Sequence, residues 1–541
     1  MLRRRHLGRV RFAEAYDLQR ALVEASDNYI LIMEHPPTYT KGVRATDESF
    51  LVDPATLDAD VISTDRGGDI TYHGPGQVVA WPVITVPDDP SSGKTHVAMM
   101  EDAIIATVTM LDPEGRLGRV GRLEEYPGVW AHLDTTPVKI AAVGVRTKRN
   151  KRGERRTMHG LALNVETDMT AFEVIIPCGI PDKPVGSLQS LGLDVSALEV
   201  EELLGQELAR LIGGEERVAR VDRSVATTSD ERPLIRRLRK AGVNPDEALP
   251  INTRKPEWLR IEAHMGQEYQ SLRTLTEDLR LVTVCEEAGC PNIFECWADG
   301  TATFMVNGER CTRACGFCLI DTRKPMPLDP TEPERVAEAV VRLKLSHAVV
   351  TCVARDDLPD GGAGAIAETI YAIRRRSPQT NVEVLISDLK GDPEALQLII
   401  DARPDVMNHN IETVARLQRA VRPSAAYHRS MTVLARSVAA GLTAKSGLMV
   451  GLGETADEVE ETLVDLASIG VSIATIGQYL RPTAKHLPVS RYWEPAEFED
   501  LAARGRLAGL AHVQSSPLTR SSYHAREALS DATPLALPTR R

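Results

Sequence analysis

Apolar residues recur along the first half of the chain in short runs that alternate irregularly between two periodicities. Runs typical of buried strands occur at residues 29–34, 138–145 and 160–165. Segments with helical spacing of apolar positions occur at 13–25, 96–111 and 200–211. Because strands and helices are interspersed without a regular order, we expect an α+β domain with a mixed or antiparallel sheet.

The second half alternates short apolar strands with helices in a regular order. The expected strands are 303–306, 348–353, 382–386, 406–408, 445–450, 473–476 and 511–514. The expected helices include 333–343, 364–375 and 456–468. Repeated strand-then-helix units build parallel sheets, so this order predicts an α/β domain with a full or partial barrel of the TIM type. The chemistry of such barrels lies at the carboxyl ends of the strands.

Composition divides the 541 residues into four parts. We expect a first domain at 8–213, a charged linker at 214–254, a second domain at 255–527 and a loose tail at 528–541. Inside the linker, residues 233–242 are expected to add a short basic helix.

The overall balance is that of a soluble globular protein, with 43% hydrophobic and 26% charged residues. No apolar run is long enough to span a bilayer, and the basic start has no following signal-peptide pattern. We therefore expect a cytoplasmic protein that does not bind membranes. The net charge of −12 argues against broad nucleic-acid binding.

Six of the eight cysteines form two groups of three, between residues 285 and 318. The first group has the spacing C-x4-C-x5-C and the second has C-x3-C-x2-C. Trios of soft thiolates suit iron–sulfur clusters, and three ligands leave one iron open for another molecule. Zinc sites more often show paired C-x2-C motifs and four ligands, and disulfide frameworks belong to short secreted chains. The pattern therefore favours two reactive iron–sulfur sites.

The second group, Cys311-Thr-Arg-Ala-Cys315-Gly-Phe-Cys318, resembles the cluster loop of radical S-adenosylmethionine (SAM) enzymes. The resemblance implies that these three cysteines hold a [4Fe–4S] cluster whose fourth iron binds SAM. It further implies one-electron cleavage of SAM to a 5′-deoxyadenosyl radical. These cysteines follow the first expected strand of the barrel, which is where the chemistry of a barrel is expected.

Further motifs resemble lipoyl synthases over about residues 255–527. They lie at 284–296, 301–305, 354–362, 408–412, 445–454, 477–482 and 520–524. The resemblance implies an auxiliary [4Fe–4S] cluster held by Cys285, Cys290, Cys296 and Ser522. It also implies that this cluster is sacrificed to place sulfur at C6 and C8 of a protein-bound octanoyl chain. A hydroxyl is a weak ligand for a soft cluster, which suits an iron that must leave.

Some residues of this half allow two interpretations. Ser522 taken alone could cap a loop backbone, and 514–517 departs from the small residues expected before the serine motif. Cys352 lies in an apolar run and is expected to pack in the core. The remaining candidates either cradle a cofactor at the barrel mouth or serve as ordinary turn residues: Asp357, Gly361, Gly362, Gly451 and Gly453.

Two segments of the first half carry candidate chemistry: the glycine-rich stretch 66–77 and the apolar strand that ends at Cys178. Between them, Lys139 lies in an apolar strand, where a lysine must extend to solvent, pair, or have a function. A lone cysteine at such a place is most often a packed core thiol.

Together these segments, with 34–40 and 158–164, resemble lipoyl(octanoyl) transferases of the biotin/lipoate protein ligase fold. The resemblance implies that Cys178 takes an octanoyl group from acyl carrier protein as a thioester and passes it to a lysine of a lipoyl domain. It implies that Lys139 lowers the pKa of that thiol. The implied acyl site comprises Arg66, Gly67, Gly68, Asp69, Ile70, Thr71, Tyr72, His73, Ala142, Val143, Gly144, Gly160, Leu161 and Ala162.

Residues 146–156 carry seven positive charges in eleven positions between two expected strands. Such a run is either a solvated hairpin tip or a docking site for acidic carrier or lipoyl domains. The sequence does not decide between these.

The two resemblances fit one sequence of reactions, because the octanoylated lipoyl domain made by the first is the substrate of the second. We therefore expect a bifunctional enzyme of lipoate biosynthesis with two [4Fe–4S] clusters and SAM. The expected partners are octanoyl-acyl carrier protein, lipoyl domains of 2-oxoacid dehydrogenases, glycine cleavage H protein, and an electron donor such as ferredoxin or flavodoxin. Two alternatives stay open: an inactive first half that only binds lipoyl domains, and a non-enzymatic iron–sulfur sensor.

Overall fold

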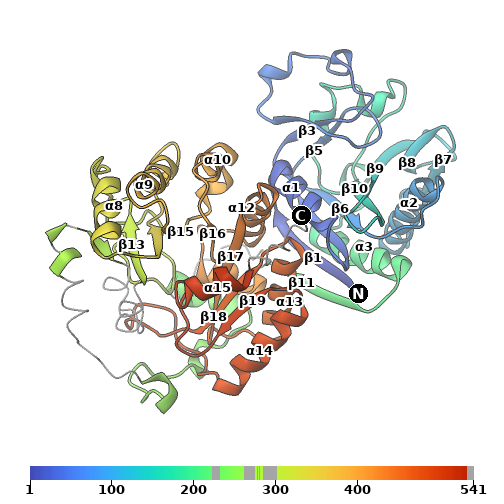
Figure 1. Ribbon diagram of the computed structural model, residues 1–541. Coiled ribbons are helices and arrows are strands. Elements are labelled where there is room, and N and C mark those ends of the chain that lie inside the picture. Colours follow the sequence, from blue (N-terminus) through green and yellow to red (C-terminus); the bar gives the residue numbers. More distant parts are fainter. Residues whose placement is uncertain (222–231, 261–273, 277, 280, 284–300, 533–541) are drawn as a thin grey trace, which may run out of the picture. The chain divides into compact units, whose positions relative to one another are not determined.

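The computed structural model describes residues 1–221, 232–260, 274–276, 278–279, 281–283 and 301–532. The chain divides into two compact units, Met1–Arg220 and Val221–Arg541. Figure 1 shows both, and each is considered by itself below. The division falls inside the expected linker at 214–254.

The first unit is built on an eight-stranded mixed sheet. Strand β1 pairs in parallel with β11 and β2, and all other neighbours are antiparallel. The spatial order is β11 (Glu216–Arg220), β1 (Leu2–Arg9), β2 (Asn28–Glu34), β6 (Gln77–Val83), β10 (Arg155–Asn164), β9 (Val138–Arg149), β8 (Tyr126–Ala131) and β7 (Gly121–Leu123). The expected mixed α+β fold is confirmed.

Helices and a second sheet complete this unit. Helices α2 (Ser92–Leu111) and α3 (Ala197–Ile212) pack side by side against the main sheet and close an apolar core around Ile104, Leu163 and Leu204. The expected helix at 13–25 is α1 (Phe12–Leu22). A small sheet of β4 (Asp60–Ser63), β3 (Thr38–Lys41) and β5 (Thr71–His73) carries the glycine-rich segment.

The second unit holds an eight-stranded sheet whose strands follow one another in chain order. After the antiparallel edge strand β12 (Val282–Thr283), all pairs are parallel. These strands are β13 (Thr301–Val306), β14 (His347–Cys352), β15 (Asn381–Leu385), β16 (Val406–Asn408), β17 (Thr443–Val450), β18 (Ile473–Gln478) and β19 (His512–Ser515). Each expected strand is present, and the sequential parallel order is that of an open barrel.

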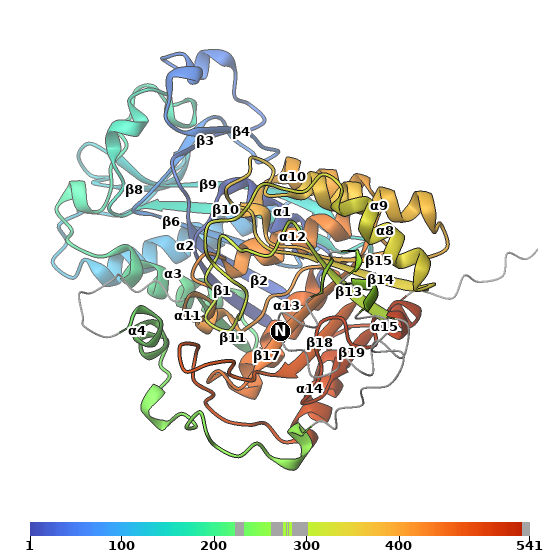
Figure 2. The same ribbon diagram turned by 90° about the vertical axis from the view of Figure 1, so that its left-hand side faces the viewer.

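Helices fill the connections between the strands. Helices α8, α9 and α10 lie side by side (Figures 1 and 2) and pack on an apolar core that includes Phe304, Ile370 and Val384. The helices of this unit are α4 (Pro233–Lys240), α8 (Glu332–Arg342), α9 (Ala363–Arg376), α10 (Pro393–Asp401), α11 (Gln418–Val421), α12 (Tyr427–Ala439), α13 (Ala456–Ser468), α14 (Pro495–Leu507) and α15 (Ala525–Ala532).

The expected linker contains ordered elements at both ends. Strand β11 extends the sheet of the first unit, and α4 packs against α11 of the second unit. Helix α4 lies within the basic helix expected at 233–242. Within the described residues, no helix has both the length and the apolar character needed to cross a membrane.

Candidate active sites

Cys178 lies on a tight turn that immediately follows the apolar run of Ile175 and Ile176. Its backbone adopts the left-handed conformation, with φ of 58°, and Gly179 follows with φ of 70°. Non-glycine residues rarely adopt this conformation, and it marks functional positions more often than ordinary turns. The Cys178 N–H donates to the Ile70 carbonyl at 2.8 Å, which ties the turn to the glycine-rich segment. The turn therefore holds the thiol at a defined place.

A cavity of about 970 Å³ brings Cys178 together with Lys139. Most residues of the expected acyl site line it. Ile70 and Tyr72 are not among the lining residues, because their side chains belong to a buried apolar cluster with Tyr39 and Phe172. The expected residues that line the cavity are Arg66, Gly67, Gly68, Asp69, Thr71, His73, Ala142, Val143, Gly144, Gly160, Leu161 and Ala162.

Lys139 is buried on β9 without a carboxylate partner among the described residues. Its Nζ lies 5.5 Å from the centre of the Trp130 ring, a cation–π contact. Gly128 leaves room for the Lys139 side chain, because a Cβ added to Gly128 would lie 2.8 Å from the Lys139 Cε. A lysine in an apolar strand can extend to solvent, form an ion pair or serve a function. The surroundings of Lys139 fit a function better than an ion pair.

A second cation, Arg66, lies in the same cavity. Its Nη2 donates to the Thr40 carbonyl at 2.7 Å and to Thr40 Oγ1 at 2.9 Å, and its Nη1 donates to the Gly67 carbonyl. Burial lowers the pKa of Arg66, and the nearby Cys178 and Asp69 oppose this shift. Lys139 and Arg66 thus place two cations in the cavity that Cys178 lines.

Two buried histidines border the cavity: His73 of the expected acyl site and His159 of the expected motif at 158–164. His73 Nδ1 lies 2.8 Å from Gln77 Oε1, and Gln77 donates to Asn164 Oδ1 at 2.9 Å. Burial lowers the pKa of His73 well below its usual value, so the ring is neutral. His159 lies 2.7 Å from Asp65 Oδ1. These contacts fix one wall of the cavity.

The basic segment 146–156 forms the β9–β10 hairpin. Four of its seven positive side chains form ion pairs: Arg149 and Arg155 with Asp88, Arg146 with Asp65, and Arg152 with Glu154. Arg156 is buried. This arrangement fits the solvated hairpin better than a free basic docking surface.

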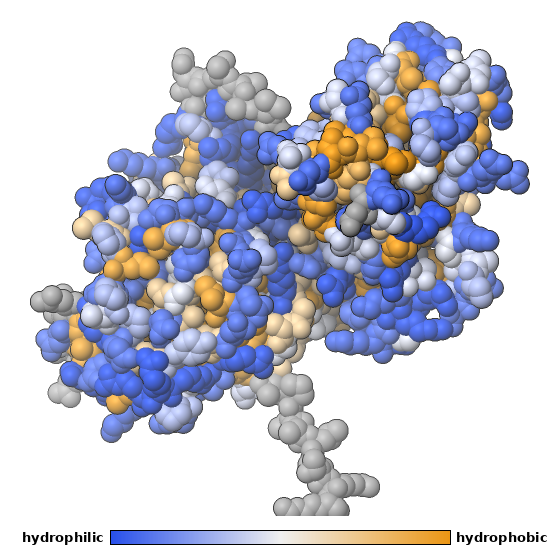
Figure 3. Space-filling model, turned by 90° about the horizontal axis from the view of Figure 1, so that it is seen from above, coloured by the Kyte–Doolittle hydropathy of each residue, from blue (hydrophilic) through white to orange (hydrophobic). Residues whose placement is uncertain are grey.

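Apolar side chains lie exposed beside the Cys178 cavity. Val43, which is 64% exposed, precedes the cavity-lining Arg44, and its N–H donates to the Arg66 carbonyl. Leu51, which is 60% exposed, bonds to Val174, close to Cys178 in sequence. Figure 3 shows apolar surface on this unit. Such a rim suits contact with a protein substrate.

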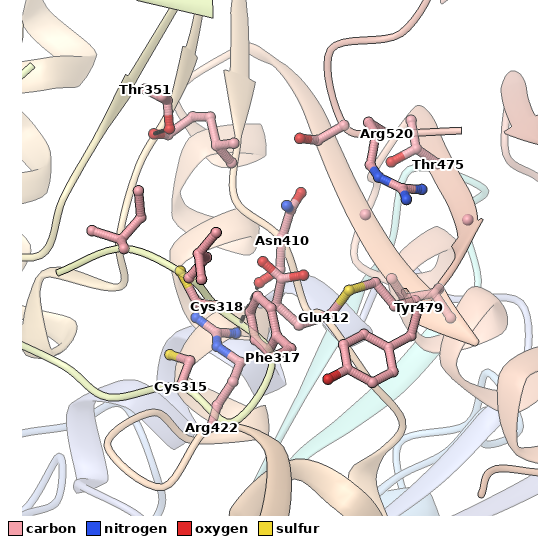
Figure 4. Close-up of a pocket in the computed structure, with 18 of the residues that line it drawn as sticks. Cys315, Phe317, Cys318, Thr351, Asn410, Glu412, Arg422, Thr475, Tyr479 and Arg520 are labelled. Carbon is pink, nitrogen blue, oxygen red and sulfur yellow. Dashed lines mark hydrogen bonds between the residues drawn. The ribbon is translucent and has the colours of Figure 1, made fainter. Parts of the chain in front are cut away.

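In the second unit, Cys311, Cys315 and Cys318 line a cavity of about 620 Å³ together with Ser522. Figure 4 shows Cys315 and Cys318 on one side of this cavity and Arg520 on the other. The loop follows β13, at the carboxyl ends of the strands as expected. The other expected ligands, Cys285, Cys290 and Cys296, lie outside the described residues.

The three cysteines fit a cluster better than a single ion. In the described part of the chain, no three histidine, cysteine or carboxylate side chains converge on one metal position. A [4Fe–4S] cluster instead needs its thiolates spread over different irons. Burial raises the pKa of Cys315 to about 11 and that of Cys318 to about 12. A bound cation is therefore needed to hold these sulfurs as thiolates.

Polar residues beside the cysteines suit an ionic ligand such as SAM. Glu412 adopts φ of 66° because its N–H and carbonyl both pair with β17, at Gly447 and Met449. Burial raises the pKa of Glu412. Arg422 donates to the Asn410 carbonyl at 2.9 Å, and its positive charge opposes the effect of burial on the pKa of Glu412. Figure 4 shows Asn410, Glu412 and Arg422 directed toward the cavity.

The sequence pointed to this part of the cavity only through the motif at 408–412 and assigned no role to its residues. Trp130, the partner of Lys139, carried no signal in the sequence. Cys352 lines the cavity and also packs against the apolar core.

The ambiguous residues act as turn or surface residues here. Asp357 forms an ion pair with Arg355 at 2.9 Å. The four glycines all have positive φ, as turn residues do: Gly361, Gly362, Gly451 and Gly453.

Comparison with known proteins finds a family for each unit. The model of the lipoyl protein ligase A/B catalytic domain matches residues 11–209, and that of the radical SAM superfamily matches residues 305–466. Lipoyl synthase of Symbiobacterium thermophilum is 54% identical over 292 residues, which cover 54% of this chain and 91% of that protein. Lipoyl synthase of Rubrobacter xylanophilus is 50% identical over 326 residues, covering 59% and 98%.

Among solved structures, the bipartite lipoate protein ligase of Thermoplasma acidophilum covers 41% of this chain and 88% of its own length, at 16% identity and a TM-score of 0.34.

The parallel sheet, the cysteine cavity and the family match define the second unit as a radical SAM enzyme. The first unit is a lipoyl protein ligase A/B catalytic domain. The chain belongs to the lipoyl synthase family, whose members match somewhat more than half of it.

Proposed function

We propose that the chain carries out two consecutive steps of lipoate biosynthesis. The first unit transfers octanoyl from acyl carrier protein to a lysine of a lipoyl domain. The second unit inserts two sulfur atoms, at C6 and C8 of that octanoyl chain. The observation that carries the proposal is the pair Cys178 and Lys139 in one cavity, within a chain whose second unit has lipoyl synthases as relatives.

In the first step, the Cys178 thiolate attacks the thioester carbonyl of octanoyl-acyl carrier protein. The carrier thiolate leaves and takes a proton from the Lys139 ammonium. The amine of the lipoyl-domain lysine then attacks the new thioester, and Cys178 leaves as the thiolate. Lys139 recovers the proton that the amine loses. Lys139 lines the same cavity as Cys178, which places it to give and recover this proton in both half-reactions.

In the second step, the residues of the second cavity bind and orient. Cys311, Cys315 and Cys318 would hold one [4Fe–4S] cluster, with Glu412, Asn410 and Arg422 facing the amine, hydroxyl and carboxylate groups of SAM. Ser522 would join Cys285, Cys290 and Cys296 around the auxiliary cluster. When bound, the two clusters and SAM supply the one-electron radical chemistry and the sulfur atoms. Substrates are lipoyl domains of 2-oxoacid dehydrogenases and glycine cleavage H protein, with ferredoxin or flavodoxin as electron donor.

Trapping of the acyl intermediate tests the first step. The full chain is incubated with octanoyl-acyl carrier protein alone, and its intact mass is measured. One octanoyl group is expected on the chain, removed by hydroxylamine and absent from Cys178→Ala. Transfer to an apo lipoyl domain should fall at least about a thousandfold in that variant. Transfer at the normal rate without Cys178 would exclude the thioester route.

The same variant also provides the control for the second step. Given a lipoyl domain that already carries octanoyl, Cys178→Ala should insert sulfur as well as the unmodified chain does. Loss of both activities would mean that the substitution damages the whole protein.

A further inference from the structure

Arg313 belongs to the cysteine loop and lies between Cys311 and Cys315 in the sequence. Its side chain is almost fully buried. Its Nε donates to Asp356 Oδ2 at 2.7 Å and its Nη2 to Asp356 Oδ1 at 2.8 Å. The same Nη2 lies 2.7 Å from Asp388 Oδ1. One guanidinium thus connects the cysteine loop to two separate carboxylates.

The two carboxylates come from the carboxyl ends of neighbouring strands. Asp356 follows β14, and its N–H donates to Thr312 Oγ1 of the cysteine loop at 3.0 Å. Asp388 follows β15 and is fully buried. Arg429 of α12 approaches the other oxygen of Asp388 at 3.6 Å. The network therefore joins the cysteine loop, two strand ends and one helix.

The loop around Asp388 is itself in an unusual conformation. Leu389, Lys390 and Gly391 all have positive φ, and the Lys390 N–H donates to Asp388 Oδ1 at 3.1 Å. The Lys390 Nζ also donates to the Asp356 carbonyl at 2.8 Å. Two consecutive non-glycine residues in this region are costly and persist only where surrounding contacts hold them. Asp388 is therefore placed to meet Arg313.

Backbone contacts hold the rest of the cysteine loop. Gly316 pairs through its N–H with Val421 and through its carbonyl with Leu487, and the Cys318 carbonyl contacts His486 Nε2 at 2.9 Å. The guanidinium of Arg313 is buried in its ion pairs. The backbone N–H of Arg313 points at Cys311 Sγ, 3.4 Å away. The backbone of this part of the loop is also held by the Cys311 and Thr312 N–H groups, which donate to the carbonyls of Asp321 and Ala354.

We propose that Arg313 is a positioning residue for the cluster at Cys311, Cys315 and Cys318, and that Asp356 and Asp388 act through it. The guanidinium, held by two carboxylates, presets the separation of Cys311 and Cys315 before iron arrives. A planar fork with several donors meets two carboxylates in fixed directions, whereas a lysine ammonium is a point charge without that geometry. Retention of the cluster thus depends on two aspartates that bind no iron. The inference rests on the cluster assignment made under the proposed function.

The test measures iron retention in the full chain, with Cys285, Cys290 and Cys296 replaced by alanine so that one cluster site remains. After anaerobic reconstitution, iron and sulfide per chain, the electron paramagnetic resonance spectrum of the reduced protein with and without SAM, and the rate of iron loss to a chelator are recorded. The variants are Arg313→Lys, Arg313→Gln, Asp388→Asn and Asp356→Asn. Asp356 is partly exposed, so its variant remains informative if Asp388→Asn fails to fold.

A matched control breaks an ion pair elsewhere in the same barrel. Asp405 lies 2.5 Å from Arg374 and accepts the Val382 N–H, at the end of the strands remote from the cysteine loop. Asp405→Asn should lower the melting temperature of the iron-free protein without changing iron loss. The Arg313 network variants should lose iron about tenfold faster than the parent, whereas Asp405→Asn should lose it at the parent rate despite its lower melting temperature.

The outcomes separate the two claims. Iron retention in Arg313→Lys equal to that of the parent would overturn the positioning role, since charge alone would then suffice. Equal iron loss in the Asp356→Asn and Asp405→Asn variants would also overturn it, because the effect would be one of general stability. A parent chain that binds no iron at this site would instead refute the cluster assignment itself.

Discussion

Both units place a buried cation next to reactive cysteines, but the two cations have opposite surroundings. Lys139 rests on the face of Trp130 and has no carboxylate partner among the described residues. Arg313 contacts Asp356 and Asp388 through three short contacts. A cation held by carboxylates keeps its proton and fixes geometry, whereas a cation without them can exchange its proton with a substrate. The comparison assigns chemistry to Lys139 and positioning to Arg313.

The most severe test of this comparison is substitution of Lys139. In Lys139→Met and in Lys139→Arg, octanoyl transfer should fall between about 10²- and 10⁴-fold. Arginine keeps the positive charge but does not release its proton in proteins, so retention of charge should not rescue the rate. The measurement is single-turnover transfer from octanoyl-acyl carrier protein. Near-normal transfer by Lys139→Arg would show that charge alone is required and would remove the contrast with Arg313.

Ser522 tests the second cavity with a smaller expected effect. In Ser522→Ala, SAM cleavage to 5′-deoxyadenosine should continue, because Cys311, Cys315 and Cys318 are unchanged. Lipoyl product should fall to below about a tenth, since the auxiliary cluster loses its oxygen ligand. Mass spectrometry of the lipoyl domain and chromatography of the nucleoside measure the two outputs. If both outputs fell together, Ser522 would serve the SAM site and not the auxiliary cluster.

A third buried cation extends the comparison to stability. Lys445 lies 2.9 Å from Glu383 Oε1 inside the barrel, where both are fully buried, and His347 approaches the same carboxylate. Burial alone would raise the pKa of Glu383, but the attraction of Lys445 outweighs it and lowers the pKa to about 2. Glu383→Gln should destabilise the second unit at neutral pH by roughly 3–5 kcal/mol, because Lys445 loses its partner.

The pH dependence of this effect follows from the lowered pKa. The carboxylate contributes fully above its unfolded pKa, near 4.5, and its contribution is lost as the pH falls toward about 2. The difference in unfolding free energy between the parent and Glu383→Gln should therefore shrink over that range, as measured by urea unfolding. A difference that stays constant from pH 7 to pH 3 would contradict the ion-pair account.

The smallest expected effect concerns the hairpin at 146–156. Reversing Lys148 and Lys151 to glutamate should raise the KM for acyl carrier protein no more than about twofold at low salt, because exposed charges are weak and screened. At high salt the difference should vanish. An increase of tenfold or more would restore the hairpin as a docking surface.

The pattern of apolar residues was enough to predict the fold class and strands β13 to β19 of the second unit, because parallel barrel strands are buried on both faces. It failed at β1, where Arg3, Arg4 and Arg5 look like a solvent-exposed start. These arginines are buried because Asp27, Glu216 and the Tyr29 ring meet them. Partners so distant in sequence leave no local signal.

The site residues, too, could be predicted where the signal is local in the sequence and not where it depends on distant partners. The cysteine spacing was sufficient to predict that Cys311, Cys315 and Cys318 share a cavity, since a short loop brings its own residues together. Of two adjacent aspartates, Asp356 meets Arg313, whereas the sequence had drawn attention to Asp357. Two adjacent residues after a strand point to different sides, and only the packed structure decides which one faces the loop.

The most direct test of the two-step reaction uses one lipoyl domain and one protein. An apo lipoyl domain is incubated anaerobically with the reconstituted chain, octanoyl-acyl carrier protein and a strong reductant, with and without SAM, and its intact mass is measured. The account predicts octanoyl alone without SAM, and octanoyl with two added sulfur atoms when SAM is present. An unmodified lipoyl domain in both samples would contradict it.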